Sequence, residues 1–251
     1  MAVVKYHVKD RVAYIVLNRP EKRNAINVEM RDRLFEIFDD VRENPDVWVA
    51  VLAGEGGVFS TGHDLVEMAA GGGHGRPTVE LYQVIEEIWK PTIAAIDGYC
   101  LAQGGGLALS CDIRIATERA VFGWPQVKRG IASTSGPCSL AHRVPLNIAF
   151  EILFTGEFLD AQEAKRLNLV NRVVPAEKLF EETDALVRKI LANAPLAMRA
   201  IKEIAVRGRD MTMEDRVRFA ETLSEHIRQS ADAKEGLAAF REKRPPVWQG
   251  R

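Results

Sequence analysis

The sequence has few cysteines, no excess of either charge and no long apolar run, and each of these shortages excludes a class of protein. Its three cysteines, an odd number among 251 residues, argue against a disulfide framework and for a reducing compartment. With 34 basic and 35 acidic residues the net charge is −1, so nothing in the charge points to a nucleic-acid partner. No apolar run approaches the roughly 20 residues that cross a bilayer, so no membrane partner is expected. The N-terminus reads into a strand rather than a signal or transit peptide, and we therefore expect a cytoplasmic globular protein.

Apolar runs and turn residues predict an α/β fold in which strands and helices alternate over the first 190 residues. Strands are expected at Val3–Lys9, Val12–Asn18, Val47–Ala53, Thr92–Ile96, Ile113–Ala116 and Val170–Val174. Helices are expected at Val28–Asn44, Val79–Trp89 and Ala161–Leu167, and then at Phe180–Ala192, Leu196–Arg207, Thr212–Gln229 and Ala231–Arg241. The chain is therefore predicted to have a core at residues 1–190 and a helical region at 191–251 that covers a neighbouring subunit.

Two glycine turns about forty residues apart are the most informative feature of the chain. The segments Phe59–Leu65 and Gln103–Leu107 each follow an apolar, strand-like run and precede a helix. Together they can direct two backbone N–H groups at one point, which is the geometry that stabilises a developing negative charge on a thioester carbonyl oxygen. In the first turn, the N–H of His63 is a candidate donor and Asp64 is expected to cap the following helix.

The same glycines do not form a dinucleotide-binding fingerprint. A G-x-G-x-x-G pattern beginning at Gly104 needs glycine at position 109 and finds Leu109, and one beginning at Gly54 fails at Phe59. A glycine-rich stretch at Ala69–Gly75 has two interpretations, a mobile flap over a site or a disordered loop.

Several motifs together resemble one family. Besides the two turns, they are Arg19-Pro20-x3-Asn24-Ala25, Phe122–Gln126, Leu153–Gly156, Ala161–Ala164 and Leu169–Val174. Over nearly its whole length the chain resembles the enoyl-CoA hydratase/isomerase (crotonase) superfamily. Within it, Gly62–Leu65 and the C-terminal segment Ala239–Trp248 are most similar to the enoyl-CoA hydratase domain-containing protein 3 group.

The resemblance implies a fold, an assembly and a set of binding residues. The fold is a spiral of ββα turns with a helical C-terminal trimerisation region, usually assembled as a dimer of trimers. The oxyanion hole is formed by the backbone amides of His63 and Gly105, and no cofactor is required besides the coenzyme A thioester substrate. The remaining residues that the resemblance assigns to substrate or CoA are Arg23, Ala25, Thr61, Gly62, Asp64, Leu65, Gly104, Gly106, Pro125, Gly130, Phe240 and Lys243.

The sequence departs from the family at the two positions where hydratases carry a glutamate. By the resemblance these are the position three residues after the middle glycine, here Ala108, and the position after the proline of the Phe-Gly-x-Pro segment, here Gln126. Water addition needs one group that activates water and one that handles the proton at Cα. Alanine does neither, and glutamine can orient a water but cannot titrate. Efficient hydration by the usual mechanism is therefore not expected.

Other side chains offer weaker candidates. The hydroxyl of Ser133 can hydrogen-bond a substrate carboxylate or a water, or it can cap a helix. Cys138 with His142 has the spacing of a nucleophile and its base, although a packed helix explains the pair as well. Tyr99 and Trp124 can line an acyl pocket or belong to the core. The other histidines, His7, His74 and His226, have no ligand spacing, so no metal site is expected.

Three functions stay open on this evidence. The first is an enoyl-CoA hydratase/isomerase-like enzyme that stabilises a thioester enolate. The second is a decarboxylase of a malonyl-type thioester, because loss of CO₂ generates the enolate without a base. The third is a protein that binds acyl-CoA without turning it over.

Overall fold

A six-stranded, mostly parallel sheet forms the centre of the computed structural model, which describes residues 2–71 and 75–251. Its strands are β1 (Val4–Lys9), β2 (Val12–Leu17), β3 (Val49–Gly54), β4 (Thr92–Ile96), β6 (Ile113–Thr117) and β9 (Arg172–Val174), in the order β1-β2-β3-β4-β6-β9. Only the β1–β2 hairpin is antiparallel. The expected hairpin and the buried strands are confirmed, but the last strand begins at Arg172 rather than Val170.

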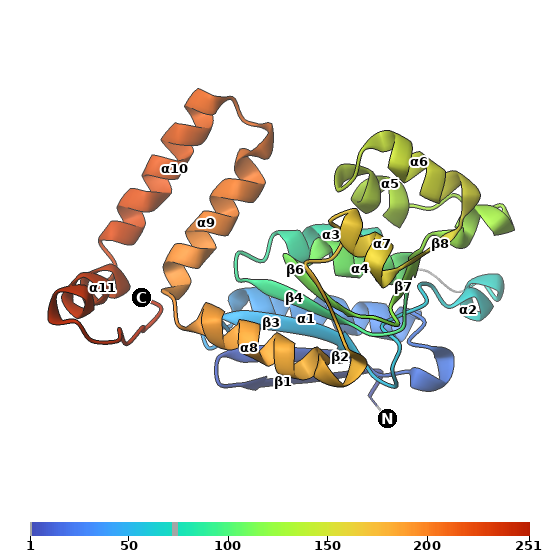
Figure 1. Ribbon diagram of the computed structural model, residues 1–251, viewed down its shortest axis with the longest axis horizontal. Helices are drawn as coiled ribbons and strands as arrows, with labels where there is room; N and C mark the ends of the chain where they lie inside the picture. Colours follow the sequence, from blue (N-terminus) through green and yellow to red (C-terminus); the bar gives the residue numbers. More distant parts are fainter. Residues whose placement is uncertain (1, 72–74) are drawn as a thin grey trace.

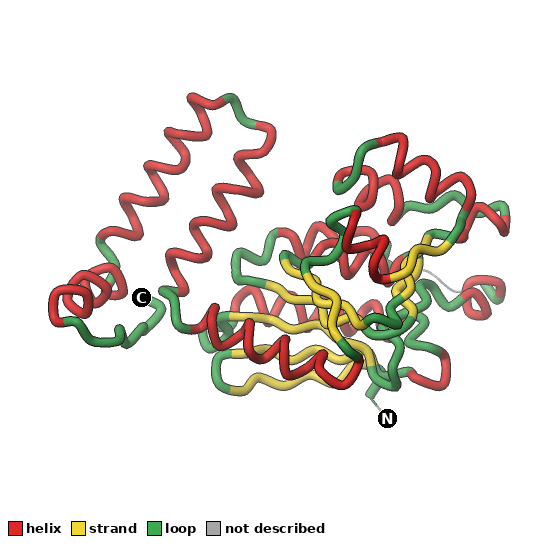
Figure 2. Tube along the Cα trace, in the orientation of Figure 1, coloured by secondary structure: helices red, strands yellow, loops and turns green. Residues whose placement is uncertain are grey.

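Helices cover both faces of this sheet (Figures 1 and 2). On one face lie α1 (Val28–Glu43), α3 (Val79–Glu86) and α4 (Gln103–Ser110), and on the other lies α8 (Leu179–Leu191). Strand β3 contributes side chains to the hydrophobic cores on both faces of the sheet. Its Ala50 and Leu52 belong to the core under α1, whereas Val49 and Val51 pack toward α8. A strand that is buried on both sides needs such a continuous apolar run rather than an alternating one.

A second, three-stranded sheet stands beside the first and forms one wall of the site. It consists of β5 (Tyr99–Leu101), β7 (Val121–Gly123) and β8 (Phe158–Asp160), in the order β5-β7-β8. Short helices gather around it: α2 (Leu65–Ala69), α5 (Ser135–Ser139), α6 (Leu146–Thr155) and α7 (Ala161–Arg166). Of these elements the sequence predicted α7 and, as the helix that follows Asp64, α2.

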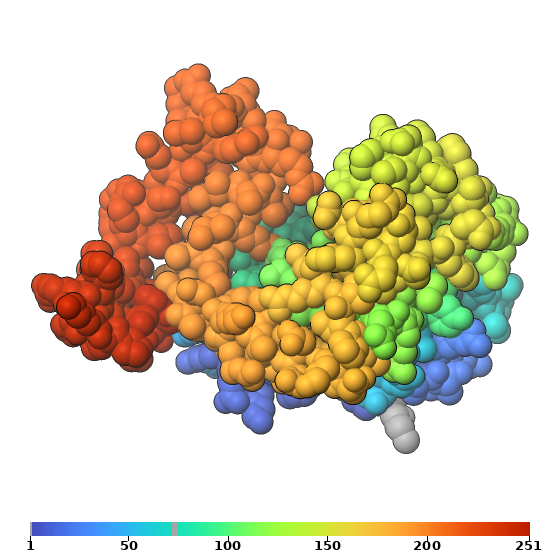
Figure 3. Space-filling view, in the orientation of Figure 1, coloured from blue at the N-terminus to red at the C-terminus, as the bar shows by residue number. Residues whose placement is uncertain are grey.

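The C-terminal helices project from the opposite end of the molecule (Figures 1 and 3). They are α9 (Pro195–Arg207), α10 (Met213–Arg228) and α11 (Ala231–Glu242), which confirm the expected helices to within two residues at each end. The chain end folds back, since the indole N–H of Trp248 donates to the Ala192 carbonyl at 2.8 Å. No helix in the described part of the chain is both long and apolar enough to cross a membrane. The predicted flap at Ala69–Gly75 falls in part on Gly72, Gly73 and His74, which lie outside the described residues.

Candidate active site

The two glycine turns meet at the end of the second sheet. The Ser60 N–H donates to the Tyr99 carbonyl, and the Leu101 N–H donates to the Ser60 carbonyl, both at 2.9 Å. The Ser60 hydroxyl donates to the Asn24 carbonyl and accepts the Gly62 N–H. These bonds hold the first turn against β5 and fix the direction in which the following residues leave it.

Close packing makes glycine necessary where the turns touch. Gly62 has a φ of +90°, and a Cβ built on it would lie 2.8 Å from the Cβ of Ala102 and 3.1 Å from the backbone nitrogen of Gln103. A Cβ on Gly104 would lie 2.7 Å from the Cβ of Ser60. The residue after Gly62 and the first residue of α4 are therefore neighbours, as the sequence predicted for the two turns.

Unpaired backbone donors occur where the turns meet. Helix α4 begins at Gln103, so the N–H groups of its first turn have no partner inside the helix. Among the described residues, no hydrogen-bond acceptor faces the N–H of either His63 or Gln103. The residue before the helix, Ala102, has φ 53° and ψ −117°, a conformation that non-glycine residues seldom adopt. Backbone strain of this kind is concentrated at functional sites.

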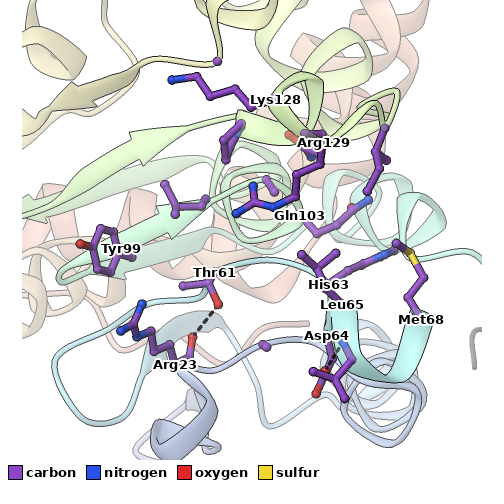
Figure 4. Close-up of a pocket in the computed structure, with 18 of the residues that line it drawn as sticks. Arg23, Thr61, His63, Asp64, Leu65, Met68, Tyr99, Gln103, Lys128 and Arg129 are labelled. Atoms are coloured by element: carbon purple, nitrogen blue, oxygen red, sulfur yellow. Dashed lines mark hydrogen bonds between the residues drawn. The ribbon is translucent and has the colours of Figure 1, made fainter. Parts of the chain in front are cut away.

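A cavity of about 940 Å³, here named the main cavity, opens beside these donors (Figure 4). Its wall is formed by Lys22, Arg23, Ala25, Thr61, His63, Asp64, Leu65, Val66, Met68, Tyr99, Leu101, Ala102, Gln103, Pro125, Gln126, Lys128, Arg129, Ile131, Ala132, Thr134, Gly156 and Phe158. Among the described residues of this wall, four side chains are cationic and only Asp64 is anionic. The cavity therefore suits a ligand that carries several negative charges.

Asp64 is already engaged by the protein. Its carboxylate accepts the backbone N–H groups of Val66 and Glu67, which caps α2 as predicted, and it pairs with Arg19 at 3.0 Å. These hydrogen bonds and the Arg19 cation outweigh desolvation and hold the pKa of the Asp64 carboxyl below its usual value. Asp64 is thus ionised at neutral pH and is a poor proton donor.

A second cavity of about 500 Å³, here named the side cavity, continues from the first. The two share His63, Asp64, Met68, Gln103 and Thr134. The remaining wall of the side cavity is formed by Ile26, Asn27, Val28, Arg31, Glu67, Gly75, Pro77, Thr78 and Val79. The ring nitrogen Nε2 of His63 lies 2.9 Å from the Thr78 hydroxyl. Burial, and then the Arg31 cation, lower the pKa of His63, so its imidazole is neutral at pH 7.

Two carboxamides beside the main cavity hold buried oxygens that lack partners. Neither the Oε1 of Gln103 nor that of Gln126 has a hydrogen-bond donor among the described residues. Gln103 is only 7% exposed, and its Nε2 donates to the Thr134 hydroxyl at 3.1 Å. Buried polar atoms are nearly always paired in folded proteins, so these two oxygens are candidates for ligand contact.

The family follows from comparison with known proteins. The family model for enoyl-CoA hydratase/isomerase matches residues 7–251. The chain belongs to this family. It is 38% identical to the (E)-benzylidenesuccinyl-CoA hydratase of Thauera aromatica, over 98% of this chain and 99% of that protein. It is 32% identical to the mitochondrial enoyl-CoA hydratase domain-containing protein 3 of Danio rerio, over 93% of this chain and 83% of that protein.

Solved structures of the family share the fold. The enoyl-CoA hydratase EchA1 of Mycobacterium marinum is 36% identical and superposes with a TM-score of 0.92, over 100% of both chains. The comparisons confirm the predicted crotonase fold with its helical C-terminal region, and the closeness to the domain-containing protein 3 group.

Several residues expected from the enoyl-CoA hydratase/isomerase family do line the main cavity. They are Arg23, Ala25, Thr61, His63, Asp64, Leu65, Pro125 and Gln126. Tyr99 also lines it, whereas Trp124 is 1% exposed and belongs to the core.

The glycines of the second turn are not part of either cavity wall. A Cβ on Gly105 would lie 2.9 Å from the Trp124 ring, and one on Gly106 would lie 2.4 Å from the Tyr82 hydroxyl. Gly62 and Gly104 pack between the turns, and Ala108 is 1% exposed in the core. These residues shape the site through backbone packing. Gly130 is exposed and also lies outside both walls.

The remaining candidates lie elsewhere. The Ser133 hydroxyl accepts the Gly136 N–H at 3.0 Å, which agrees with the helix-capping interpretation. Cys138 and His142 are both exposed and line neither cavity. Phe240 and Lys243 belong to the end of α11, on the far side of the chain from α2 and the cavities (Figure 1). Within one chain, therefore, they do not reach the site.

Sequence reasoning missed several residues of the two cavity walls. The most important is Gln103, which is the first residue of α4 and lines both cavities. Three other missed residues add positive charge to the main cavity and therefore indicate an anionic ligand: Lys22, Lys128 and Arg129. A polar residue immediately before a glycine run, close after a strand, is the signal that could have identified Gln103.

Proposed function

We propose that this chain binds an acyl-CoA thioester and stabilises its enolate in an oxyanion hole formed by the backbone N–H groups of His63 and Gln103. The observation that carries the proposal is the pair of unpaired donors on two turns in direct contact, beside a cavity with a cationic wall. Donors fixed in advance at a developing oxyanion are usually the largest single contribution to such catalysis.

Gln103 is the better choice for the second donor than Gly105, which the resemblance to the family implied. Gln103 is the residue whose nitrogen lies against Gly62, and it lines the main cavity. Gly105 lines neither cavity and faces Trp124. With the donor at Gln103, the position three residues later on the same helix face is Gly106, which also carries no carboxylate.

The CoA portion is proposed to bind along the cationic part of the main cavity. Lys22, Arg23 and Arg129 are placed to pair with its phosphates, whereas Lys128 already pairs with Glu157 at 2.6 Å. Relatives whose names specify a CoA thioester, such as the (E)-benzylidenesuccinyl-CoA hydratase, support this ligand class. No cofactor besides the thioester substrate is part of the proposal.

We favour enoyl-CoA hydratase/isomerase-like chemistry carried out without the usual carboxylate pair. Gln126 is placed to orient a water or hydrogen-bond the substrate, and the imidazole of His63, which is neutral at pH 7 and lines both cavities, can accept a proton. Decarboxylation of a malonyl-type thioester is the second candidate. It is favoured by one observation: among the described residues of the main cavity wall, the single carboxylate, Asp64, is already paired.

Three parallel incubations separate the candidates. Loss of the conjugated-thioester absorbance of crotonyl-CoA supports hydration, and CO₂ release from methylmalonyl-CoA supports decarboxylation. Binding of butyryl-CoA by calorimetry, with no product from any thioester by mass spectrometry, supports a protein that only binds. If no CoA thioester binds, the proposal is wrong.

We also propose that α9, α10 and α11 join copies of the chain into a trimer or a dimer of trimers. Exposed apolar side chains on these helices, including Ile201, Val217, Leu237 and Phe240, would then be covered. Sedimentation at several protein concentrations tests this, and a monomer throughout would contradict it. The roles expected of Phe240 and Lys243 depend on such an assembly.

A further inference from the structure

The side cavity is the place where the acyl group of a bound thioester would lie, given the proposed function. Of the four cationic side chains of the main cavity, none lines the side cavity. His63 and Gln103, the proposed oxyanion donors, line both. A thioester held at these donors with its CoA toward the cations therefore directs its acyl chain into the side cavity, whose volume of about 500 Å³ has room for several carbons.

The wall of the side cavity is more polar than a plain hydrocarbon chain requires. Each charged side chain in its described wall has a partner within the protein. Arg31 pairs with Asp32 at 2.8 Å and Asp64 with Arg19 at 3.0 Å, while the Glu67 carboxylate accepts the Val28 N–H at 2.9 Å. A charged acyl substituent would have to compete with these interactions, and opposite charges in the wall would partly cancel its attraction.

The carboxamide of Gln103 is different, because its oxygen has no hydrogen-bond partner among the described residues. Its side chain is more than nine-tenths buried, Nε2 is held by Thr134, and Oε1 has no donor among the described residues. His63 and Thr78, which also line the side cavity, are bonded to each other at 2.9 Å. Among the described side chains of the side cavity, Gln103 therefore carries the only fully buried polar atom without a partner, beside the proposed path of the acyl chain.

A hydroxyl is the substituent that fits this carboxamide best. Oε1 has almost no accessible surface, so the carboxamide must tilt toward the cavity before a hydroxyl can donate to this atom. If the amide turns by 180°, Oε1 accepts from Thr134 and Nε2 faces the cavity, where a hydroxyl can accept from it. A ketone pairs with only one of these orientations and an ammonium with only the other.

We propose that the acyl group of the substrate carries a hydroxyl beyond its reacting α- and β-carbons, and that the side chain of Gln103 recognises it. The inference rests on the proposed function, since it assumes that a CoA thioester occupies the main cavity. The backbone of Gln103 then holds the thioester oxygen while its side chain selects the acyl group.

Calorimetric titration of six-carbon thioesters tests the inference. The ligands are hexanoyl-CoA, the isomers with one hydroxyl at C4, C5 or C6, and adipoyl-CoA as the charged comparison. We expect one hydroxylated isomer to bind roughly threefold to tenfold more tightly than hexanoyl-CoA, which is the range of a neutral hydrogen bond. Equal binding of hexanoyl-CoA and all three isomers would overturn the inference, as would tightest binding of adipoyl-CoA.

Two variants test whether the side chain of Gln103 causes the preference for a hydroxylated thioester. Gln103→Met keeps the backbone N–H and most of the side-chain volume, and we expect the preference for the hydroxylated isomer to fall to about one. Thr78→Val, which removes a hydroxyl that already has a partner in the same cavity, should retain the preference. A preference that survives in Gln103→Met would refute the role of this side chain.

Failures of the two proposals are distinguishable. Absence of binding by every thioester refutes the proposed function itself, whereas binding without discrimination refutes only the hydroxyl preference. The comparison among ligands uses the wild-type protein, so it stands even where a variant folds poorly.

Discussion

Replacing Gly62 with alanine tests whether contact between the two turns forms the site. Gly62 has a φ of +90°, and placing alanine in such a conformation costs about 1–3 kcal/mol. The added Cβ would lie 2.8 Å from the Cβ of Ala102 and 3.1 Å from the backbone nitrogen of Gln103. Neither atom belongs to a flexible side chain, so the turns must separate, at an overpacking cost of about 1–3 kcal/mol. We expect a total loss of unfolding free energy of about 2–6 kcal/mol.

Gly71 provides the matched control, because it shares the backbone conformation and lacks the contacts. Its φ is +80°, and a Cβ built on it meets no atom within 4 Å among the described residues. Gly71→Ala should therefore show the conformational cost alone, at most about 1–3 kcal/mol. Urea denaturation of both variants measures the difference, which isolates the cost of pushing the turns apart.

The functional effect should exceed what lost stability explains. Separating the turns moves the N–H of His63 relative to that of Gln103, and removing one oxyanion donor typically costs 10²–10³-fold in rate. In conditions where Gly62→Ala remains folded, we expect a loss of about that size in turnover of the thioester that the wild type accepts. A Gly62→Ala protein that is no less stable than Gly71→Ala, and that processes this thioester at the wild-type rate, would refute the reasoning.

Three further substitutions give independent tests. Ala102→Gly should raise the unfolding free energy by about 1 kcal/mol in urea denaturation. The reason is that relief of the native backbone strain at φ 53° outweighs the free energy lost because glycine gives the unfolded chain more conformational freedom. Burial lowers the pKa of Lys90 to about 8, while its amine donates to the Val41 and Asn44 carbonyls at 2.6 Å. Between pH 8 and 10.5 the unfolded chain holds this proton and the native chain does not, so stability should rise with pH by up to about 3 kcal/mol relative to Lys90→Met. Denaturation of both proteins across this range measures it, and parallel curves would contradict it. Gln126→Glu should raise crotonyl-CoA hydration roughly tenfold or more if a missing carboxylate limits the rate; an unchanged rate in the absorbance assay would show that it does not.

The sequence predicted the long strands and helices well, because each of their residue patterns is compatible with only one type of secondary structure. Val49–Gly54 and Thr92–Ile96 are continuous apolar runs bounded by turn residues, and both form strands buried on two faces. Helix α6 was missed because Leu146–Thr155 is apolar nearly all round and gives no single-faced periodicity. Its Phe150 and Phe154 are exposed in this chain. Strands β5 and β7 have three residues each, which is too short for a pattern to be recognised.

The sequence predicted that the two glycine turns form the candidate site, but it did not predict which backbone N–H of the second turn is the donor. The resemblance to the family implied Gly105 as the second donor, but the start of a helix is set by backbone conformation rather than by composition. Here the helix begins at Gln103 because Ala102 adopts φ 53° and ψ −117°. Alanine gives no indication of such a conformation, which is more typical of glycine. The sequence alone therefore could not identify Gln103 as the residue that supplies the second N–H donor.

The glycine triplet is explained by packing, and this explains why a carboxylate is missing from its helix face. Gly104 lies against Ser60, Gly105 against Trp124, and Gly106 against Tyr82. Tyr82 is 5% exposed and belongs to the core, so the space beyond Gly106 is filled from α3. A glutamate introduced at position 106 would collide with the Tyr82 ring and hydroxyl, whose nearest atoms lie 2.3 to 2.7 Å from a Cβ there. Restoring a carboxylate on this face therefore requires a smaller residue at position 82 as well, whereas a glutamate at position 126 has the size of the glutamine that it replaces.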